Sequence, residues 1–475
     1  MSGREAAPLR RYLFVMVNLD RRRFLNVSTA GLAGAAGATS SAAVAAPAAQ
    51  TLSALGRDAA QFGVRSNSGD DQTRLLQRAI DDCARNATPL VIAPGIYRTS
   101  MLTLPANAQL VGVRGASKLQ FTGGGPSLLS SEGTDNLALT GLVLDGGRIP
   151  LPPRRGLLHA LSVQTLRVDD CEFLASGGCG IWIENVSGQV RTTLFRDIAA
   201  TALVSFDAQG LLVAQNTIIG TNDNGIEILR TAIGDDGTLV IDNRIEDIKA
   251  GPGGSGQYGN AINAFRAGNV IVRGNRIRNC DYSAVRGNSA SNIQITGNSI
   301  TNACEVALYS EFSFEGAVIA HNTVDVCATG VSVCNFNEGG RLAVVQGNII
   351  RNILPKRPAG TAPDDDGGVG IYVEADASVT GNVIENAPSF GIVAGWGKYL
   401  RDVTISGNVI RKTFVGIGIS VTSGAGTALV DNNVISDAPR GAVVGLDHFR
   451  PVTPDLTRSG AEKLAQVVLG TNQVR

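Results

Sequence analysis

The sequence is poor in aromatic residues and carries no net charge. Phe, Trp and Tyr make up 5% of its 475 residues, whereas 58 residues are Gly, and this composition fits many short strands and tight turns. Lys plus Arg and Asp plus Glu both number 41, so nothing predicts a nucleic-acid or membrane-surface partner. No apolar run reaches the length of a transmembrane helix. No Cys-x-x-Cys, His cluster or Gly-rich phosphate loop predicts a cofactor.

What the sequence does contain is an asparagine that recurs down most of the chain. It stands in the frame β-branched–x–x–Asn–x–aliphatic, with a last copy at Asn472. Counting two earlier copies that carry Cys171 and Thr193 in the Asn position, the steps are 22 to 39 residues. Such a period indicates one short supersecondary unit stacked on its neighbours, and so a single elongated domain. The predicted structural ladder consists of Asn216, Asn243, Asn275, Asn298, Asn322, Asn348, Asn382, Asn408 and Asn433.

Each repeat predicts short parallel strands. Eight or nine residues after the Asn comes a Gly–aliphatic–x–aliphatic segment, as at residues 225–228, and this alternation is typical of a strand with one buried face. Stacked at about 4.8 Å, each Asn can hydrogen-bond the Asn of the next coil, which satisfies a buried amide. We therefore predict an all-β, single-stranded parallel β-helix of about 12 coils.

The N-terminal 48 residues predict an export signal. The run Asp-Arg-Arg-Arg-Phe-Leu-Asn at residues 20–26 precedes a small-residue stretch with Ala-x-Ala cleavage sites near residues 43–48. This run resembles a twin-arginine signal, with an ordinary secretory signal as the alternative and Met16 as an alternative start. We expect a periplasmic or extracellular protein that uses the twin-arginine translocase, with no membrane segment in its mature form.

A helical cap is predicted over residues 49–100, ahead of a β-helix over residues 101–475. Asp70 or Asp71 is the expected N-cap, and the helix would cover the open end of the solenoid. The apolar residues on its predicted buried face are Leu75, Leu76, Ala79, Ile80, Cys83 and Ala84.

Three motifs in this region carry a family resemblance. Phe-Gly at residues 62–63, Gly-Asp-Asp-x-Thr at 69–73 and Pro-Gly-x-Tyr at 94–97 resemble the start of pectate-lyase-superfamily proteins. The repeats resemble the right-handed β-helices of polysaccharide lyases, polygalacturonases and mannuronan epimerases. With the export signal, the chain is similar to a twin-arginine-translocated β-helix family whose activity is unassigned. The resemblance implies a right-handed solenoid and says little about chemistry.

The catalytic signatures of those enzymes are missing. Polygalacturonases use clustered Asp with Gly-His-Gly, and epimerases of this fold use Asp-Pro-His-Asp, whereas His159, His321 and His448 fit neither pattern. The triple Asp at residues 364–366 predicts a solvated turn, with Ca²⁺ binding as the alternative. No cofactor is identified, and Ca²⁺ is the one ion for which we retain a role.

The outward side chains of the Gly–aliphatic strands are the candidate site. Neighbouring coils lie about 5 Å apart, so Glu227, Asn263, Arg286, Tyr309 and Glu311 should form one strip. The predicted catalytic residues are Glu227, Arg286, Tyr309 and Glu311. The predicted substrate-binding residues are Trp182, Glu184, Asn263, Arg266, Asn288, Tyr372, Glu374 and Trp396.

This strip predicts a polysaccharide partner. Arg286 and Arg266 would bind uronate carboxylates, and Tyr309 or Arg286 would abstract a proton while Glu227 and Glu311 act as acid or as Ca²⁺ ligands. The predicted function is an exported protein that binds an acidic polysaccharide, with lyase-type β-elimination as its reaction if it is an enzyme. The alternatives are a glycoside hydrolase and a non-catalytic glycan-binding or envelope scaffold protein, whose outward side chains are polar because they meet water.

Cysteines and long loops complete the predictions. Of the seven Cys, three lie about one coil apart, at residues 280, 304 and 327, and we expect them to stack in one column as buried free thiols. A disulfide between neighbouring coils is the alternative. The loops at residues 251–259 and 355–368 precede outward strands, so we expect both to wall the candidate site.

Overall fold

A computed structural model describes residues 55–475 except 254–255, 335–340 and 362–366. The predicted export signal at residues 1–48 and the Asp turn at residues 364–366 lie outside the described residues. The chain separates into two units, Met1–Pro47 and Ala48–Arg475, and the described residues all belong to the second. No helix among the described residues is long and apolar enough to span a membrane.

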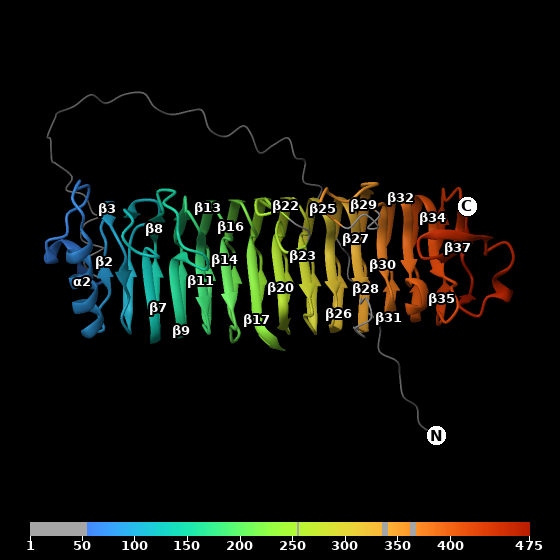
Figure 1. Ribbon diagram of the computed structural model, residues 1–475, viewed down its shortest axis with the longest axis horizontal. Coiled ribbons are helices and arrows are strands. Elements are labelled where there is room, and N and C mark those ends of the chain that lie inside the picture. Colours follow the sequence, from blue (N-terminus) through green and yellow to red (C-terminus); the bar gives the residue numbers. More distant parts are fainter. Residues whose placement is uncertain (1–54, 254–255, 335–340, 362–366) are drawn as a thin grey trace, which may run out of the picture. The chain divides into compact units, whose positions relative to one another are not determined.

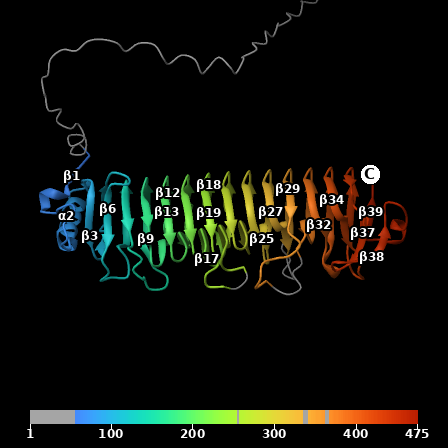
Figure 2. The ribbon, with the colours of Figure 1, turned by 90° about the horizontal axis from the view of Figure 1, so that it is seen from above.

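The second unit is a right-handed parallel β-solenoid of about 14 turns, which confirms the predicted fold class. Successive turns follow one another in chain order along the stack (Figures 1 and 2). The estimate of 12 coils was low because the first turns, up to residue 140, lack the Asn frame by which the coils were counted.

Three parallel ladders run along the solenoid, and each turn supplies one strand to each ladder. The first ladder, before the Asn position, contains β1 Arg57–Asp58, β2 Leu90–Val91, β5 Ala108–Val111, β12 Gly188–Arg191, β15 Leu212–Ala214, β18 Leu239–Ile241, β21 Ile271–Arg273, β24 Ile293–Thr296, β26 Glu315–Ala320, β28 Arg341–Gln346, β31 Ala375–Thr380, β33 Arg401–Ser406, β35 Ala428–Asp431 and β39 Val467–Leu469.

The second ladder follows the Asn, and the third is formed by the Gly–aliphatic strands. The second contains β3 Gly95–Thr99, β6 Ser117–Phe121, β8 Leu142–Asp145, β10 Glu172–Leu174, β13 Leu194–Ile198, β16 Thr217–Thr221, β19 Arg244–Ile248, β22 Arg276–Cys280, β29 Ile349–Ile353, β36 Val434–Ser436 and β40 Gln473–Val474. The third contains β4 Leu102–Thr103, β11 Cys179–Glu184, β14 Leu203–Phe206, β17 Ile226–Asp235, β20 Ile262–Gly268, β23 Val285–Asn288, β30 Val369–Val373 and β37 Gly441–Asp447.

Some strands are long enough to serve two ladders. The third and first ladders share β7 Leu129–Thr140 and β9 Gly156–Asp169, and the second and third share β25 Ser299–Glu311, β27 Thr323–Cys334, β32 Val383–Ala394 and β34 Val409–Ser420. The remaining strand, β38 Arg450–Asp455, pairs antiparallel with β37. Aliphatic side chains from all three ladders fill the interior as one continuous core.

A helix caps the N-terminal end of the stack (Figure 1). Helix α2, Thr73–Arg85, buries five of the six predicted residues, and Leu75 packs partly against the core. The predicted N-cap is wrong by one position, because Gln72 occupies it without a side-chain cap bond. Gln72 instead turns inward, where its Oε1 accepts from the Arg65 backbone N–H at 3.1 Å. Short 3₁₀ helices are η1 Ala59–Phe62, η2 Gly397–Tyr399 and η3 Ala461–Lys463.

The Asn residues form a hydrogen-bonded ladder from Asn216 to Asn472. The Oδ1 of Asn298, for example, accepts from the Asn275 backbone N–H at 2.9 Å and from its Nδ2 at 3.0 Å. The Nδ2 of Asn298 donates in turn to Asn322 Oδ1 and to the Val272 carbonyl. The pattern repeats at each coil, so every one of these amides has its hydrogen bonds satisfied inside the protein.

The prediction for the cysteine column is wrong at Cys304. Cys280 and Cys327 pair in register with Ala303, and a side chain one position further along a strand points to the opposite face. All seven thiols are free, and Cys304 alone is not fully buried. The inter-coil disulfide is therefore absent, and burial of the free thiols of Cys280 and Cys327 agrees with the expectation.

Candidate functional site

The third ladder aligns the outward side chains in a column on one face of the solenoid. Glu227, Asn263, Arg286 and Tyr309 pair in register on consecutive strands, as the comparison of coils predicts. Glu311 lies in a second column, where it pairs with Asn288. From Trp182 to Val393 the first column reads Trp182, Val204, Glu227, Asn263, Arg286, Tyr309, Ser332, Tyr372 and Val393.

The expectation that these outward side chains meet water is wrong at Trp182 and Asn263, each 8% exposed, and again from Tyr309 onward. Tyr309 is 5% exposed and Glu311 is 1% exposed, and Tyr372 and Glu374 are equally well covered. The turn between β37 and β38 contributes part of this cover, since the ring centroid of Phe449 lies 5.8 Å from that of Tyr372. Beneath it, Tyr372 Oη donates to Glu374 Oε1 at 2.6 Å.

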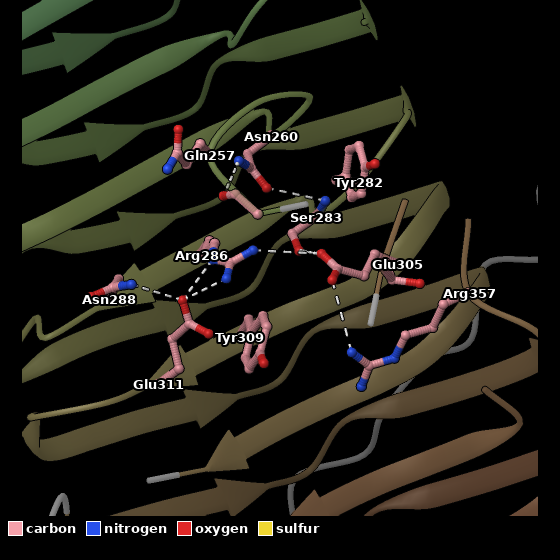
Figure 3. A network of polar contacts seen from close by, with 12 residues as sticks. Gln257, Asn260, Tyr282, Ser283, Arg286, Asn288, Glu305, Tyr309, Glu311 and Arg357 are labelled. Atoms are coloured by element: carbon pink, nitrogen blue, oxygen red, sulfur yellow. Dashed lines mark hydrogen bonds and ion pairs between the residues drawn. The ribbon is translucent and has the colours of Figure 1, made fainter. Parts of the chain in front are cut away.

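Arg286 lies in a buried ion cluster (Figure 3). Its Nη2 lies 2.7 Å from Glu311 Oε1, and its Nη1 lies 3.6 Å from Glu305 Oε2. Glu305 Oε1 lies 3.8 Å from Arg357 Nη1. Asn288 Nδ2 also donates to Glu311 Oε1, at 2.9 Å. Two cations therefore face two anions, and the cluster has no excess positive charge for a uronate.

This cluster corrects the predicted roles of Arg286, Tyr309 and Glu311. Burial lowers the pKa of Arg286, but the neighbouring Glu311 and Glu305 outweigh it and the net pKa is raised. Burial raises the pKa of Tyr309 well above its ordinary value. Neither group suits a base at neutral pH, and the Glu311 carboxylate is occupied by its ion pair. Glu227 and Glu311 also lie three coils apart, so they do not share a Ca²⁺ site.

Both predicted loops contact this face. The Asn260 Nδ2 donates to the Gly256 carbonyl at 3.1 Å, and Gly256 has a φ of +87°. A Cβ at that position would lie 2.3 Å from Arg286 Nη1, so only glycine allows this approach. From the other loop, the Ala359 carbonyl accepts from Tyr282 Oη at 3.2 Å.

Two carboxyl groups meet where β17 begins. Asn224 Nδ2 donates to Glu227 Oε1 at 2.8 Å and to Asp223 Oδ1 at 3.1 Å. Thr201 Oγ1 donates to Glu227 Oε2 at 3.3 Å. Burial, and then the charge of Asp223, raises the pKa of Glu227 to about 7. Burial raises the pKa of Asp223 to about 6.

This pair differs from the ion cluster in having no cation bound to it among the described residues. Next to it in the column, Asn263 is 8% exposed, and no described group donates to its Oδ1. A buried acceptor without a donor is costly. Asn263 Oδ1 is therefore suited to accept a hydroxyl or N–H from a ligand that also reaches Glu227.

An aromatic cluster lies on the N-terminal side of the pair. Trp182 Nε1 donates to Glu184 Oε1 at 2.7 Å, and the Arg154 guanidinium lies 5.5 Å from the Trp182 ring and 5.7 Å from the Phe206 ring. Burial, and then the nearby Arg155, lowers the pKa of His159 to about 4. The predicted residues Trp182 and Glu184 thus lie on the same face as Glu227, two coils away.

The remaining predicted residues do not join the pair. Arg266 is exposed on β20, where its Nη1 donates to the Thr231 carbonyl at 2.8 Å. Trp396 lies past the end of β32, with its ring centroid 4.7 Å from that of His448. His321 follows β26 directly, so it lies at a strand end as predicted.

The prediction from sequence missed the residues that connect these groups. Three of them, Asn224, Asn260 and Ser283, stand with Thr201 in the row of positions just before the small residue that opens a third-ladder strand. Comparison of that position across coils would have found these three, whereas Gln257 and Arg357 lie in the two long loops. The missed residues are Asp223, Asn224, Gln257, Asn260, Ser283, Glu305 and Arg357.

The described residues contain no group of three His, Cys, Asp or Glu side chains arranged to hold a metal. The carboxyl pair can transfer protons, because its two members have raised and unequal pKa values near neutrality. Asn224 holds the two carboxyl groups close together, because its Nδ2 donates to both. The same Nδ2 also donates to the Gln257 carbonyl at 2.9 Å.

The comparisons with known proteins agree with the fold. A family model described as "Right handed beta helix region" matches residues 232–410. No curated protein matches the sequence. An N-terminal fragment of gene product 12 of bacteriophage Phi29 is similar in structure, with 15% identity, 84% of this chain and 70% of that chain covered, and a TM-score of 0.51.

Two carbohydrate-active proteins are also similar in structure. A family 28 exopolygalacturonase of Yersinia enterocolitica has 12% identity and a TM-score of 0.50, with 74% of this chain and 78% of that chain covered. The A-module of a mannuronan C-5 epimerase of Azotobacter vinelandii has 14% identity and a TM-score of 0.46, with 88% and 99% covered. At 12% identity the likeness to the exopolygalacturonase concerns the fold alone and leaves the chemistry to the site.

Proposed function

We propose that the protein is an exported carbohydrate-active enzyme that binds a polysaccharide across β17 and β20 and cleaves a glycosidic bond with Glu227 and Asp223. The observation that carries this proposal is the carboxyl pair held by the Asn224 amide. A pKa of about 7 keeps much of Glu227 protonated at neutral pH, whereas a pKa of about 6 leaves most of Asp223 ionised. One group is then an acid and the other a base or nucleophile, as glycoside hydrolysis needs.

The surroundings of the pair support a glycan ligand. Asn263 Oδ1 offers a buried acceptor for a sugar hydroxyl, and Trp182 and Phe206 offer aromatic rings on the same face. The structural similarity to an exopolygalacturonase agrees with a glycan as the ligand of this site. The uronate specificity and the β-elimination suggested by the sequence lose support, because Arg286 is already paired with Glu311 and Glu305.

Export is part of the proposal. Residues 20–26 and the small-residue stretch that follows them support a twin-arginine signal, and hence a periplasmic or extracellular site of action. Polysaccharide would be reached there without crossing a membrane.

The test is to incubate the purified protein with neutral and uronate-containing polysaccharides, with and without Ca²⁺, and to measure product masses. Products heavier than the corresponding unsaturated fragments by one water indicate hydrolysis. Glu227→Gln should lower the rate by about 10² to 10⁴, and Asp223→Asn should also lower it strongly. Unsaturated products would contradict hydrolysis and restore the lyase assignment.

Glu385→Gln is the matched control. Glu385 is a surface carboxylate on β32, bound to Lys412 Nζ at 2.8 Å, so its replacement should leave the rate unchanged. Equal activity in the Glu227→Gln and Glu385→Gln variants would exclude the carboxyl pair. Thermal melting of each variant shows whether a loss of activity is a loss of fold.

A non-catalytic glycan-binding protein is the second candidate, and the aromatic cluster favours it. The half-buried Phe206 ring and the exposed Arg154 guanidinium, packed on the buried Trp182 ring, supply a contact surface that needs no chemistry from Glu227. Binding of intact polysaccharide without any cleavage product, abolished by Trp182→Ala and retained by Glu227→Gln, would establish this function in place of the first.

A further inference from the structure

The outward row of the second ladder changes character along the solenoid. Its register runs Thr217, Arg244, Arg276, Ser299, Thr323, Ile349, Val383, Val409 and Val434. Along this stretch the first five members are polar and the last four are aliphatic, whereas the part of the row before Thr217 is mixed and consists of Ile96, Lys118, Val143, Glu172 and Leu194. Ile349 is 46% exposed, Val383 is 41% exposed and Val409 is 38% exposed. Contiguous exposed aliphatic side chains on adjacent strands mark an interaction surface rather than an ordinary solvated face.

A row of alternating charge runs beside this aliphatic row, two residues further along each strand. Asp325, Arg351, Glu385 and Arg411 pair in register on β27, β29, β32 and β34. Within the chain, Arg351 Nη2 lies 2.9 Å from Asp325 Oδ2 and Arg411 Nε lies 3.8 Å from Glu385 Oε1. These groups remain largely at the surface, so a partner can still approach them.

We propose that this surface binds a second copy of the same chain. It consists of the aliphatic row Ile349, Val383 and Val409 and the charged row Asp325, Arg351, Glu385 and Arg411. The two-fold axis would lie in the interface, parallel to the strands and midway between β29 and β32. Such an axis keeps the strand direction and reverses the order of the coils. Ile349 then faces Val383 of the partner subunit, and Thr323 faces Val409 of the partner subunit.

Charge complementarity is the argument for a second copy as the occupant. The same axis places Arg351 opposite Glu385 of the partner subunit and Asp325 opposite Arg411 of the partner subunit. Since both copies repeat at the same strand spacing of about 4.8 Å, one matched pair brings the other pairs into register. A shift by one coil would place Arg351 opposite Arg411 of the partner subunit, so repulsion between like charges selects the register.

The surface lies on the second ladder and does not depend on the proposed activity. Its test is sedimentation velocity of the full chain over a range of concentrations. We expect a reversible monomer–dimer equilibrium, and Val383→Lys should raise its dissociation constant by at least about tenfold, because it buries a charge at the centre of the interface. The matched control is Leu429→Lys, since Leu429 is 42% exposed on β35 of the first ladder.

A charge exchange tests the register. Arg351→Glu should weaken the dimer, because Glu385 of the partner subunit would then face a like charge, and Arg351→Glu with Glu385→Arg should restore it. A monomer at every concentration would overturn the proposal. A dimer that Val383→Lys leaves intact would also overturn it, as would a dimer weakened equally by Leu429→Lys. Binding of the monomer to lipid vesicles, abolished by Val383→Lys, would replace the second copy with a different occupant.

Discussion

Two columns of polar side chains run along this solenoid, and they differ in how completely their members are satisfied. In the Asn ladder, each Oδ1 accepts from the backbone and the side chain of the preceding Asn, with the same geometry at every coil. The column at the start of the third-ladder strands is short and irregular. Asn224 Nδ2 donates hydrogen bonds to Asp223, to Glu227 and to the Gln257 carbonyl. The column continues through Asn260 and Ser283 to the buried Glu305.

The difference separates residues that hold the fold from residues available for chemistry. A position that is filled by the same residue at every coil, with all its hydrogen bonds made inside the protein, has no donor or acceptor free to bind a ligand. Positions that depart from the repeat contain the carboxyl groups of raised pKa and the unpaired Asn263 Oδ1. Local departures from an otherwise consistent fold are expected at functional sites. Each of the following experiments replaces or labels residues of the Asn ladder or of the site around the irregular column, and compares the effect with that at a matched position elsewhere.

Arg286→Met should have the largest effect on stability. It leaves Glu311 buried without the Arg286 Nε and Nη2 donors, which both bind its Oε1, and removes one of the two cations beside Glu305. An unpaired charge in the interior costs about 3–5 kcal/mol. Urea denaturation followed by circular dichroism measures this loss.

Arg341→Met is the control for that change. Arg341 Nη2 lies 3.2 Å from Glu315 Oε1, and both side chains are more than half exposed, so the loss should stay below about 1 kcal/mol. Equal destabilisation by the two variants would mean that the Arg286 cluster is hydrated and behaves as a surface ion pair.

Asn298→Ala should have a smaller but clear effect. It removes an acceptor from Asn275 and donors from Asn322 Oδ1 and the Val272 carbonyl, and unsatisfied buried groups cost about 1–3 kcal/mol. Urea denaturation is again the measurement. Asn136→Ala, at an exposed position on β7, should change stability by no more than about 0.5 kcal/mol. A loss at Asn298 no greater than at Asn136 would contradict a structural role for the ladder.

The regular column was predictable from the sequence, and the irregular one was not. The Asn frame repeats, so it revealed the parallel ladders and the register that aligns Glu227, Asn263 and Arg286. The repeat period carries no information about the path of a loop. The burial of Tyr309 and the approach of Arg357 to Glu305 therefore could not be predicted from it. The outward direction of these side chains was correctly inferred, but their exposure to water was not.

The misplacement of Cys304 has a related cause. Its position was counted from the cysteine spacing of 24 and then 23 residues, whereas the paired positions lie 23 residues apart from Cys280 to Ala303 and 24 apart from Ala303 to Cys327. A displacement of one residue moves a side chain to the other face of a strand. Spacing therefore predicts a column only where it equals the length of each coil.

The carboxyl pair should make stability depend on pH. Folding raises the pKa of Glu227 from 4.5 to about 7 and that of Asp223 from 3.8 to about 6. The folded state then binds more protons than the unfolded state between about pH 4 and 7, so this stabilisation is complete below pH 4 and disappears as the pH rises to 7. The free energy of unfolding, measured at a series of pH values, should show this fall, and Glu227→Gln should reduce it.

Glu385→Gln provides the opposite sign as a control. A hydrogen bond from Lys412 lowers the pKa of Glu385, so its contribution is present above pH 4.5 and is lost below that value. The variant should therefore keep the wild-type fall between pH 5 and 7. An unchanged fall in Glu227→Gln would show that the carboxyl pair is hydrated and titrates as it does in the unfolded chain.

The smallest expected effect is the reaction of a single thiol. Cys304 is partly exposed, whereas the other six cysteines are buried. Burial raises the pKa of Cys304, and it raises the pKa of Cys171 to about 12 and of Cys179 to about 12. A thiolate is the reactive form, so a thiol reagent at pH 8 should label Cys304 in the native protein and all seven cysteines after unfolding. Cys304→Ser should abolish native labelling without changing the melting temperature. Rapid labelling of Cys280 or Cys327 in the native state would mean that the coils open locally, and that the regular columns are less rigid than their hydrogen bonds indicate.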